Sequence, residues 1–497
     1  MSFSLNELYL ISLVFILNFS CTKEEFYSEP DKLLVFSVDT LSFDTVFTSL
    51  ASATKSIKIF NPHDRFIKIT TAKLENGSNS KFRINIDGTA GELFQDIIIR
   101  PRDSIYVFVE VTVDPDAPLI ESPFIITDAL VLTVNGVEQK LVLLAWGQNA
   151  NYFPSKSNKS QIGYIDLQGQ VMIWDDPKPY IIYGIVYVDN GDLIIPEGTQ
   201  IYVSGGITKG VDAEGNSFFY NDGRIIIGPN ARIIVNGSID KPVIFQGVRL
   251  EEAFRNIPGQ WSGIVLDKSS HGNSFTHCTI KNNLLGIYLD SLSEAVFHYC
   301  KIYNNSLHGI YAFASNVKAD NCLFYNQGQQ SFIGVLGGKY EFNFCSFANV
   351  GNNESGVVVR NNVCLDPPFC QQVISSDLQA KWTNCIISGS DKDEFWQIKD
   401  SDQRKMFDVQ LEHCILRVSD LIKPENYPDF ISTQTNKCII SNNLEKLFKD
   451  ISNDDFHLDT LSIAEGKAIP LMGFEKDLDG KLRDALTPDI GCYEYIK

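Results

Sequence analysis

The sequence contains no run of lysine and arginine, and its 42 basic residues are outnumbered by 61 acidic ones, so the formal net charge is −19. A phosphate backbone would be repelled by such a surface, and we therefore expect no nucleic-acid partner. The chain has 7 histidines and 11 cysteines but no Cys-x-x-Cys or histidine-rich spacing. We therefore expect neither a zinc site nor any other metal or cofactor.

Long apolar segments are absent as well, except for one short run at the N-terminus. Residues 8–19 are mostly apolar, too few to span a bilayer comfortably as a helix, and Ser20-Cys21 follows them. This order resembles a bacterial lipoprotein precursor, which implies that residues 1–20 are a signal peptide and that Cys21 carries the lipid. A buried or membrane-spanning N-terminal segment with a chance cysteine is the alternative.

The residues after Cys21 carry a second signal. Residues 21–31 begin CTKEEF, and a lysine followed by two acidic residues after the lipidated cysteine resembles the surface-export signal of Bacteroidetes-type lipoproteins. Lys23, Glu24 and Glu25 fill those places. The resemblance implies an outer-membrane lipoprotein that faces the cell exterior, with residues 21–31 as the linker.

Residues 32–150 contain short alternating segments bounded by turn residues, and no helical period. In Ala129–Trp146 the pair Asn135-Gly136 separates two alternating apolar runs, which is the strongest short signal for a β-hairpin. Such closely spaced strands predict an antiparallel sandwich. The pattern resembles the immunoglobulin-like domains found beside long repeat domains in secreted proteins, which implies a spacer or docking role.

A short pattern led by cysteine returns at a regular step in the second part of the chain. It begins at Cys278 (CTIKNN), Cys300 (CKIYNN) and Cys322 (CLFYNQ), continues at Cys345, and recurs less regularly at Cys385 and Cys414. The first two steps are 22 residues each. Self-similarity at this period is typical of a solenoid, in which each unit covers the open face of its neighbour.

The residue types of the repeat indicate which solenoid forms. Its units are short runs of Ile, Val, Phe and Tyr broken by Gly and Asn, with neither a helical period nor leucines at fixed places. A right-handed parallel β-helix fits, with three short strands per coil and a rise of about 4.8 Å. The cysteines then form one inward row. The asparagines that follow them form a second ladder at a turn.

Two other segments support this interpretation. Gly259–Asp267 (GQWSGIVLD) and Asp477–Tyr495 (DLDGKLRDALTPDIGCYEY) resemble a coil and the terminal segment of β-helix lipoproteins exported by bacteria. From residue 151 onward the chain resembles the pectin-lyase-like superfamily. The expected fold is all-β, with an immunoglobulin-like β-sandwich over residues 32–150. A right-handed parallel β-helix over residues 151–497 follows, and a C-terminal capping segment completes it.

The cysteines besides Cys21 lie in a chain that we expect to reach an oxidising compartment, where disulfides form. Neighbours one coil apart would place their Cβ atoms farther apart than a disulfide prefers, so we expect the row to be a reduced, buried ladder. Cys364 and Cys370 differ because they flank LDPPF, a proline-rich loop that interrupts the repeat. The sequence leaves open whether these two form a disulfide.

The sequence identifies no catalytic centre. β-Helix lyases combine acidic calcium ligands with an arginine or lysine base, and β-helix hydrolases carry clustered aspartates, but the corresponding segments are missing here. The LHG segment around His308 matches half of a hydrolase motif, and we expect His308 to face solvent at a turn. The DLDG segment from Asp477 begins like a calcium loop without its distal glutamate, and we expect it to cap the last coil.

Two groups of residues remain as candidates for binding. Tyr288 and Tyr311 occupy matching places in GIYLD and GIYAF, where exposed rings would stack on sugars. The charged insertion at residues 249–259 would either be a solvated loop or overhang a groove.

Together these features favour a surface-exposed lipoprotein whose β-helix presents an elongated face to a carbohydrate or protein partner. The expected partners are a polysaccharide or a cell-envelope protein, with the membrane reached through the lipid anchor. The resemblance to pectin-lyase-like proteins leaves a polysaccharide lyase or glycoside hydrolase as the alternative. A purely structural spacer in the envelope is a third reading of the same features.

Overall fold

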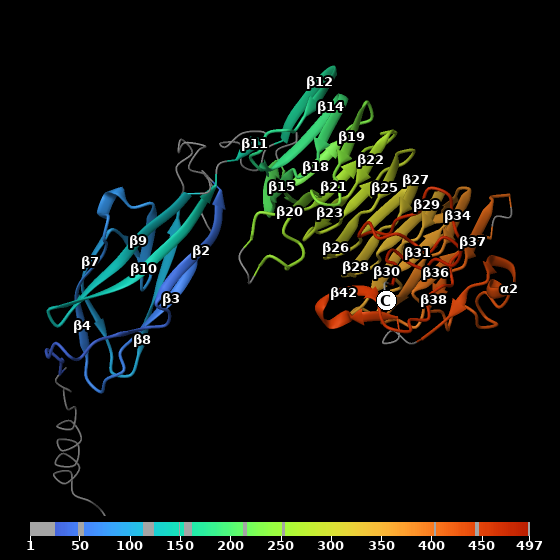
Figure 1. The fold of residues 1–497 in the computed structure, drawn as a ribbon. Helices are drawn as coiled ribbons and strands as arrows, with labels where there is room; N and C mark the ends of the chain where they lie inside the picture. Colours follow the sequence, from blue (N-terminus) through green and yellow to red (C-terminus); the bar gives the residue numbers. More distant parts are fainter. Residues whose placement is uncertain are drawn as a thin grey trace, which may run out of the picture. The chain divides into compact units, whose positions relative to one another are not determined.

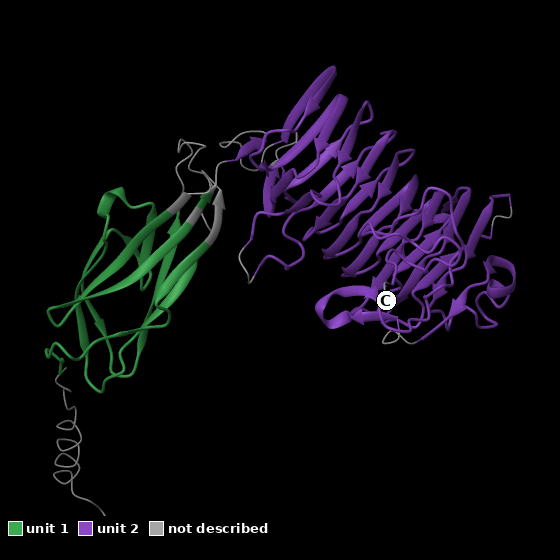
Figure 2. Cartoon of the chain, viewed as in Figure 1, with its two compact units in different colours: residues 1–149 green, residues 150–497 purple. Residues whose placement is uncertain are grey.

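The computed structural model describes residues 25–47, 54–112, 124–148, 150–153, 162–211, 216–250, 254–401, 404–442 and 447–495. The chain forms two compact units, residues 1–149 and residues 150–497 (Figure 2). The predicted signal peptide, Cys21, Lys23 and Glu24 lie outside the described residues, whereas the Glu25 carboxylate lies 3.4 Å from the Arg65 guanidinium. No helix in the described part of the chain is long and apolar enough to cross a membrane.

Unit 1 is a β-sandwich of two five-stranded sheets (Figure 1). The first sheet has the order β1 (Val35–Phe36), β3 (Lys55–Phe60), β8 (Ser104–Val111), β5 (Phe82–Ile86) and β6 (Thr89–Gly91). The second has the order β2 (Thr40–Phe47), β10 (Val137–Gln148), β9 (Phe124–Val134), β4 (Ile67–Leu74) and β7 (Leu93–Ile99), and a short 3-10 turn, η1 (Gly77–Asn79), follows β4. Buried and exposed residues alternate along β3 and β8, so each strand covers the core with one face.

The hairpin predicted at Asn135-Gly136 joins β9 to β10. Val134 pairs with Val137 in antiparallel register, and Asn135 and Gly136 have φ of 49° and 77°. Positive φ at both central residues is the geometry that matches the twist of the flanking strands. The sandwich is therefore confirmed, and among its described strands β10 pairs in parallel with β2.

Unit 2 is a parallel β-helix with three faces (Figure 1). Face 1 consists of β12 (Ile162–Ile173), β14 (Ile185–Pro196), β18 (Arg224–Ile227), β21 (Gly263–Leu266), β24 (Ile287–Leu289), β27 (Ile310–Asp320), β29 (Phe332–Asn343), β31 (Val357–Arg360) and β36 (Phe395–Ile398). Face 2 consists of the second halves of β12, β14, β27 and β29 with β19 (Ala231–Asn236), β22 (Asn273–Thr276), β25 (Glu294–His298), β34 (Leu378–Thr383), β37 (Phe407–Glu412) and β39 (Thr435–Asn436).

Face 3 is a separate sheet that completes each coil. It consists of β11 (Asn151–Phe153), β13 (Tyr180–Tyr183), β15 (Gln200–Ser204), β20 (Val243–Gly247), β23 (Cys278–Lys281), β26 (Lys301–Asn305), β28 (Leu323–Gln327), β30 (Ser346–Asn349), β35 (Ile386–Gly389), β38 (Ile415–Leu416) and β40 (Ile439–Ile440). Two antiparallel hairpins leave the coils: β16 (Ile207–Val211) with β17 (Ser217–Asn221), and β32 (Asn362–Cys364) with β33 (Val373–Ser375).

The interior is built from rows of identical or similar side chains, as the repeat predicts. Cys278, Cys300, Cys322, Cys345, Cys385 and Cys414 are buried and unpaired, and Cys438 extends the row while half-buried. The Cys300 thiol donates to the Phe275 and His298 carbonyl oxygens, 3.3 and 3.4 Å away. The row beside it contains Phe275 and Phe297, whose rings stack 5.0 Å apart, followed by Ala319 and Phe342. The reduced, buried ladder is therefore confirmed.

Single left-handed residues make the corners between the faces. The residue before each ladder cysteine has φ between 43° and 58° (His277, Tyr299, Asn321, Phe344, Asn384, His413 and Lys437). At the next corner Asn282, Asn304 and Asn326 take the left-handed conformation that suits asparagine. The buried Asn305 amide donates to Gln327 Oε1 at 2.8 Å, whereas the buried Asn283 side chain has no hydrogen-bond partner among the described residues. The predicted amide ladder is therefore present between Asn305 and Gln327 and does not extend to the Asn283 side chain.

The two remaining parts of unit 2 cover its last coil and one face. Residues 418–434, which include α2 (Phe430–Gln434), cover the last coil with Leu421 and Phe430, both almost fully buried. Residues 447–495, which we call the coat, contain β41 (Phe448–Asp450), η3 (Ile451–Asn453) and β42 (Asp455–Leu458). The coat packs its own apolar side chains onto the outer surface of face 3.

Candidate functional site

An unbroken row of apolar side chains, which we call the stripe, runs along the outer surface of face 1. Its members occupy equivalent register positions on nine successive strands: Tyr164, Tyr187, Ile226, Val265, Tyr288, Tyr311, Ile333, Val358 and Trp396. Tyr164 is 58% exposed and the others are half-buried. Because they alternate with inward residues such as Ile287 and Leu289, all of them point away from the core.

The stripe has the geometry of a platform for stacking. Tyr288 and Tyr311 pair directly across β24 and β27, and their ring centroids lie 5.6 Å apart. Tyr164 and Tyr187 lie 5.5 Å apart with nearly parallel rings. Since neighbouring coils are separated by about 4.8 Å, the stripe offers one apolar group at each step along the helix axis.

Glycines border the stripe on one side. Gly263, Gly286 and Gly309 each stand two residues before a stripe residue, and a Cβ at any of them would meet a backbone carbonyl of the next coil within 2.5 Å. The coils therefore pack backbone to backbone along this edge, and the stripe is held on a rigid support.

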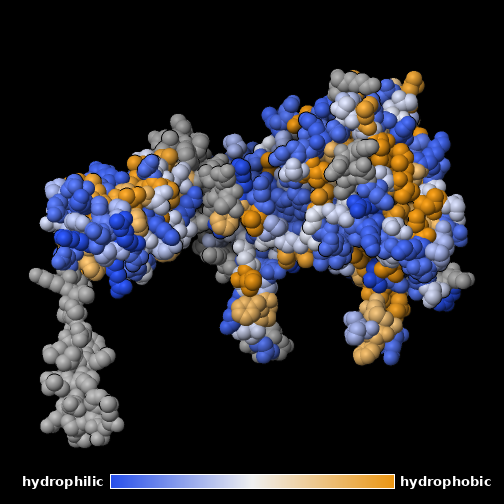
Figure 3. All heavy atoms as spheres, turned by 90° about the horizontal axis from the view of Figure 1, so that it is seen from below, coloured by the Kyte–Doolittle hydropathy of each residue, from blue (hydrophilic) through white to orange (hydrophobic). Residues whose placement is uncertain are grey.

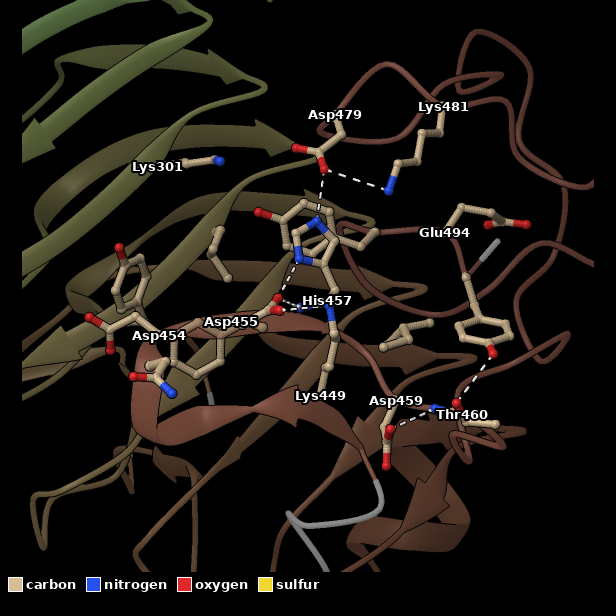
Figure 4. A pocket seen from close by; sticks show the side chains of 17 residues that line it. Lys301, Lys449, Asp454, Asp455, His457, Asp459, Thr460, Asp479, Lys481 and Glu494 are labelled. Atoms are coloured by element: carbon tan, nitrogen blue, oxygen red, sulfur yellow. Dashed lines mark hydrogen bonds and ion pairs between the residues drawn. The ribbon is translucent and has the colours of Figure 1, made fainter. Parts of the chain in front are cut away.

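A cleft of about 810 Å³ lies at the border between the coat and face 3 (Figure 4). His457 on β42 stands in it with its ring stacked on Tyr493, centroids 4.0 Å apart. His457 Nδ1 lies 2.5 Å from Asp455 Oδ1 and Nε2 lies 2.7 Å from Asp479 Oδ2. The hydrogen bond to Asp479 raises the pKa of His457, burial opposes this, and the bond to Asp455 adds to it.

Both ring nitrogens of His457 donate to carboxylates when the imidazole is charged, so neither is free to take a proton from a ligand. Lys449 lies 3.2 Å from Asp455 and Lys481 lies 3.8 Å from Asp479, which spreads the charge of both pairs. The arrangement joins β42 to the DLDG turn. We therefore interpret the cluster as a clamp that holds the coat together.

The terminal motif forms the inside of the coat. Asp477 Oδ1 accepts from the Asp479 and Lys481 backbone amides at 3.0 and 2.8 Å, as a turn requires. Arg483 is buried, lies 3.4 Å from Glu494, and donates to Asn321 Oδ1 at 2.8 Å. The predicted turn chemistry is present, but the segment differs from expectation in its position. It lies along face 3, where Gly480 approaches Ile239, and residues 418–434 cover the last coil instead.

His308 also differs from its expected exposure. It is half-buried, its ring lies 5.4 Å from Tyr311, and burial lowers the pKa of its imidazole to about 4. Its Nδ1 is buried without a hydrogen-bond partner. The following coil and the Tyr311 ring cover the His308 side chain. The prediction that His308 faces solvent at a turn is therefore wrong.

The insertion at residues 249–259 is tied to the coil below it. Arg249 lies over the Phe254 ring at 3.8 Å, and the Asn282 amide donates to the Arg255 and Ile257 carbonyl oxygens. Glu251 and Glu252 lie outside the described residues. Cys364 and Cys370 form a disulfide in the β32–β33 hairpin, which answers the question that the sequence left open.

Hydrophobic side chains are also exposed outside the stripe. Figure 3 shows one side of the surface, where they gather in patches between hydrophilic groups and on two narrow projections. The most exposed aromatic residues of the hairpins are Phe219 at 72% and Phe369 at 77%. Within the described ranges, no group of three or more His, Cys, Asp or Glu side chains is arranged to hold a metal ion.

One feature of the sequence indicates both the stripe and the covered surface of face 3, although the alternation of apolar and polar residues does not reveal it. Coils such as CLFY, CIIS and GIYL place apolar residues consecutively, which is typical of strands covered on both sides. Of the stripe, only Tyr288 and Tyr311 were recognised as candidates. The remaining members become a surface only once the register aligns them.

Comparison with known proteins supports the fold. The family model of the right handed beta helix region matches residues 262–444. No curated protein matches the chain.

Three solved structures illustrate the likeness to known folds. The periplasmic alginate epimerase is 11% identical, with a TM-score of 0.28, covering 56% of this chain and 83% of its own. A thermostable GH87 alpha-1,3-glucanase from Streptomyces thermodiastaticus is 8% identical, with a TM-score of 0.23 and coverages of 72% and 79%. A family 123 glycoside hydrolase from Clostridium perfringens is 10% identical, with a TM-score of 0.18 and coverages of 38% and 44%. At these values the likenesses carry no argument about function.

Proposed function

We propose that this protein is a surface-exposed lipoprotein that binds polysaccharide along face 1 of its β-helix. The observation that carries the proposal is the stripe, which presents aromatic and aliphatic side chains in register on nine successive strands. Sugar rings have apolar faces that stack on such side chains, and a polymer supplies one ring after another along the axis. A row is therefore better matched to a chain than to a single small molecule.

The rigidity of the face supports binding without rearrangement. The inward neighbours of the stripe, such as Ile287 and Ile310, are fully buried, and parallel pairing fixes each coil against the next. Little conformational entropy is lost when a ligand settles on such a surface. Repeated weak stacking contacts along one polymer then add to a useful affinity.

The test is binding of the purified protein to a panel of polysaccharides, comparing the native protein with Tyr288→Ala/Tyr311→Ala. Removing both rings should weaken binding at least tenfold, because each stacked ring contributes on the order of 1 kcal/mol. The matched control is Tyr106→Ala/Phe108→Ala, which removes an exposed aromatic pair with centroids 6.0 Å apart in unit 1. Equal losses in the two variants would contradict the assignment to face 1.

The same panel tests the enzymatic alternative. Release of unsaturated ends would indicate a lyase, and release of reducing ends would indicate a hydrolase. The lipid is tested separately, because Cys21→Ala should move the protein out of the membrane fraction. Replacing Lys23, Glu24 and Glu25 by alanine should keep the lipid but remove protease accessibility on intact cells.

A further inference from the structure

We propose that the polysaccharide bound by the stripe is neutral, and that a row of carboxylates along one edge of the stripe excludes polyuronates. This inference rests on the function proposed above and names the class of ligand.

The carboxylates occupy the outward position two residues after a stripe residue on the upstream strands of face 1. They are Asp166, Asp189, Asp267 and Asp290, after Tyr164, Tyr187, Val265 and Tyr288 respectively. Asp166 pairs with Asp189 in parallel register. The Asp267 and Asp290 amides continue the ladder by donating to the Ile227 and Leu266 carbonyl oxygens, each at 2.9 Å. Gly228 occupies this position directly after β18, so the row has one gap between Asp189 and Asp267 and otherwise follows the stripe over this half of the face.

Hydrogen bonds show that two of these carboxylates, Asp189 and Asp267, lie beside aromatic rings. Tyr187 donates its hydroxyl to Asp267 Oδ2 at 2.9 Å, and Tyr164 donates to Asp189 Oδ2 at 3.3 Å. Burial, and then this bond to Asp267, raises the pKa of Tyr187 to about 12. Burial, and then the charge of Asp290, raises the pKa of Tyr288 to about 12. A sugar stacked on these rings would meet the carboxylates with its ring substituents.

The basic residues along the face compensate this charge only in part. Arg224 stands on the opposite edge, two residues before Ile226, and burial lowers the pKa of its guanidinium. Lys268 is exposed in the turn after Asp267. Arg360 is the last residue of β31, at the other half of the face, where it donates to the Asn362 side chain and carbonyl oxygen. Among the described residues, four carboxylates face only two basic residues, Arg224 and Lys268, in the half of face 1 that runs from β12 to β24. This half therefore carries a net negative charge.

The substituents on the sugar ring decide whether the carboxylate row attracts or repels a bound polysaccharide. Hydroxyl groups of a neutral sugar donate to carboxylates in charge-assisted hydrogen bonds, which are stronger than bonds between neutral groups. A uronate places a second carboxylate against the first, and like charges at short range on a partly buried surface repel. The carboxylates on or directly after β12, β14, β21 and β24 repeat this penalty along a bound polyuronate.

The decisive probes are polygalacturonate and its fully methyl-esterified form, which share one sugar backbone and differ in the charge and the added methyl group of each carboxyl group, together with neutral glucan, mannan, xylan and galactan. We expect the native protein to bind neutral probes, and the ester about tenfold or more tightly than polygalacturonate at low salt. Asp267→Asn/Asp290→Asn keeps the shape of both side chains and one acceptor oxygen on each, and it removes two charges. It should reduce the preference for the ester to within about threefold.

The control is Asp408→Asn/Glu341→Gln, which removes two charges from face 2 and should leave the preference unchanged. A native preference for polygalacturonate, or a control that shifts the preference as much as the face 1 pair, overturns the inference. If Tyr288→Ala/Tyr311→Ala then still abolishes binding, the proposed function stands without it. Failure of every probe to bind overturns the proposed function and this inference together.

Discussion

Face 1 and face 3 are outer surfaces of the same β-helix, but their apolar outward residues are in different environments. On face 3, Leu323, Ile386 and Ile415 lie under the coat and are 3%, 0% and 0% exposed. On face 1, Tyr288 and Tyr311 occupy the same kind of outward position and remain half-exposed. The coils of both faces have consecutive apolar residues, which predicts cover on both sides of the sheet.

On face 3 the chain itself supplies the cover, whereas on face 1 we propose that a ligand supplies it. The coat supplies it on face 3 through apolar contacts and through the corner residues of the coils. Asn384 exchanges two hydrogen bonds with the Ile469 backbone, and His413 Nδ1 lies 2.9 Å from the Lys467 carbonyl oxygen. The stripe on face 1 has the same apolar character without this attachment, and that contrast motivates the proposal of a polysaccharide there.

The largest effect that we predict is the destabilisation of the coat by Arg483→Ala, which would remove the cover from face 3. The Arg483 side chain is 2% exposed and its partner Glu494 is 6% exposed, so the substitution leaves a buried carboxylate without its counter-charge. We expect a loss of about 3–5 kcal/mol in the free energy of unfolding of the coat. The measurement is denaturant-dependent thiol labelling of Cys492, which belongs to the coat and is buried against face 3.

Arg232→Ala is the control for this substitution, because it removes the same side chain from an exposed pair. Arg232 Nε lies 2.7 Å from Asp192 Oδ1, with 48% and 23% of the two side chains exposed. Such pairs contribute about 0–1 kcal/mol. Equal losses in the two variants would show that the Arg483 pair does not hold the coat.

The coils could be predicted from the sequence because each depends on residues that recur at a fixed step. The inward cysteines, the phenylalanines at Phe275 and Phe297, and the asparagines at the turn are local features that repeat. Each recurrence places the same side chain over itself one coil later. The fold therefore follows from a pattern 20–25 residues long.

The position of the coat could not be predicted in this way, since its contacts join residues far apart in the sequence. Arg483 reaches Asn321 across 162 residues, and the Cys492 amide reaches Ser346 across 146. No local signal sets such a contact. The stripe required the register as well, because Ile226, Val265 and Ile333 are ordinary strand residues until they are aligned.

Two outward isoleucines, one on each face, allow face 1 and face 3 to be compared through a smaller loss of stability. Ile386 points outward on face 3 and is fully buried, whereas Ile333 points outward in the stripe and is half-buried. Ile386→Ala should cost about 3 kcal/mol, within the range for a fully buried isoleucine, and Ile333→Ala about half as much or less. Equilibrium denaturation measures both values.

Polysaccharide binding of the same two variants separates the faces. We expect Ile333→Ala to weaken binding while Ile386→Ala leaves it unchanged under conditions where both proteins are folded. Weaker binding by Ile386→Ala alone would place the ligand on the coat side and contradict the assignment to face 1.

The clamp around His457 makes the attachment of the coat depend on pH. The pKa of His457 is raised in the folded protein, so its contribution is complete below its ordinary pKa of about 6.5 and is lost as the pH rises through the folded value. The bond from His457 lowers the pKa of Asp479, whose contribution is lost only as the pH falls through that lowered value. The clamp is therefore complete in the mildly acidic range.

His457→Gln tests this dependence against the native protein. At pH 6 the substitution should destabilise the coat by about 1–2 kcal/mol, the range for bonds to charged groups after a discount for the half-exposed ring. The gap should shrink between pH 6 and pH 9. Amide hydrogen exchange in β42 measures it, and a gap that grows with pH would contradict the assignment of charge to His457.

The smallest predicted effect is the loss of stability on substituting a cysteine of the thiol row. This row lies in the interior that face 1 and face 3 share. Cys300→Ser would bury a hydroxyl, but the Phe275 and His298 carbonyl oxygens that accept from the thiol remain within reach. A satisfied buried hydroxyl costs little, so we expect a loss below about 1 kcal/mol. Cys300→Ala should lose a similar amount through packing alone.

Thiol labelling of the native protein tests the same row without substitution. Cys438 is half-buried and should react first, while Cys278, Cys300 and Cys322 should stay unlabelled until the β-helix unfolds. Burial raises the pKa of the Cys278 and Cys300 thiols, which further suppresses the reactive thiolate. Rapid labelling of these cysteines in the folded protein would show that the row does not face inward.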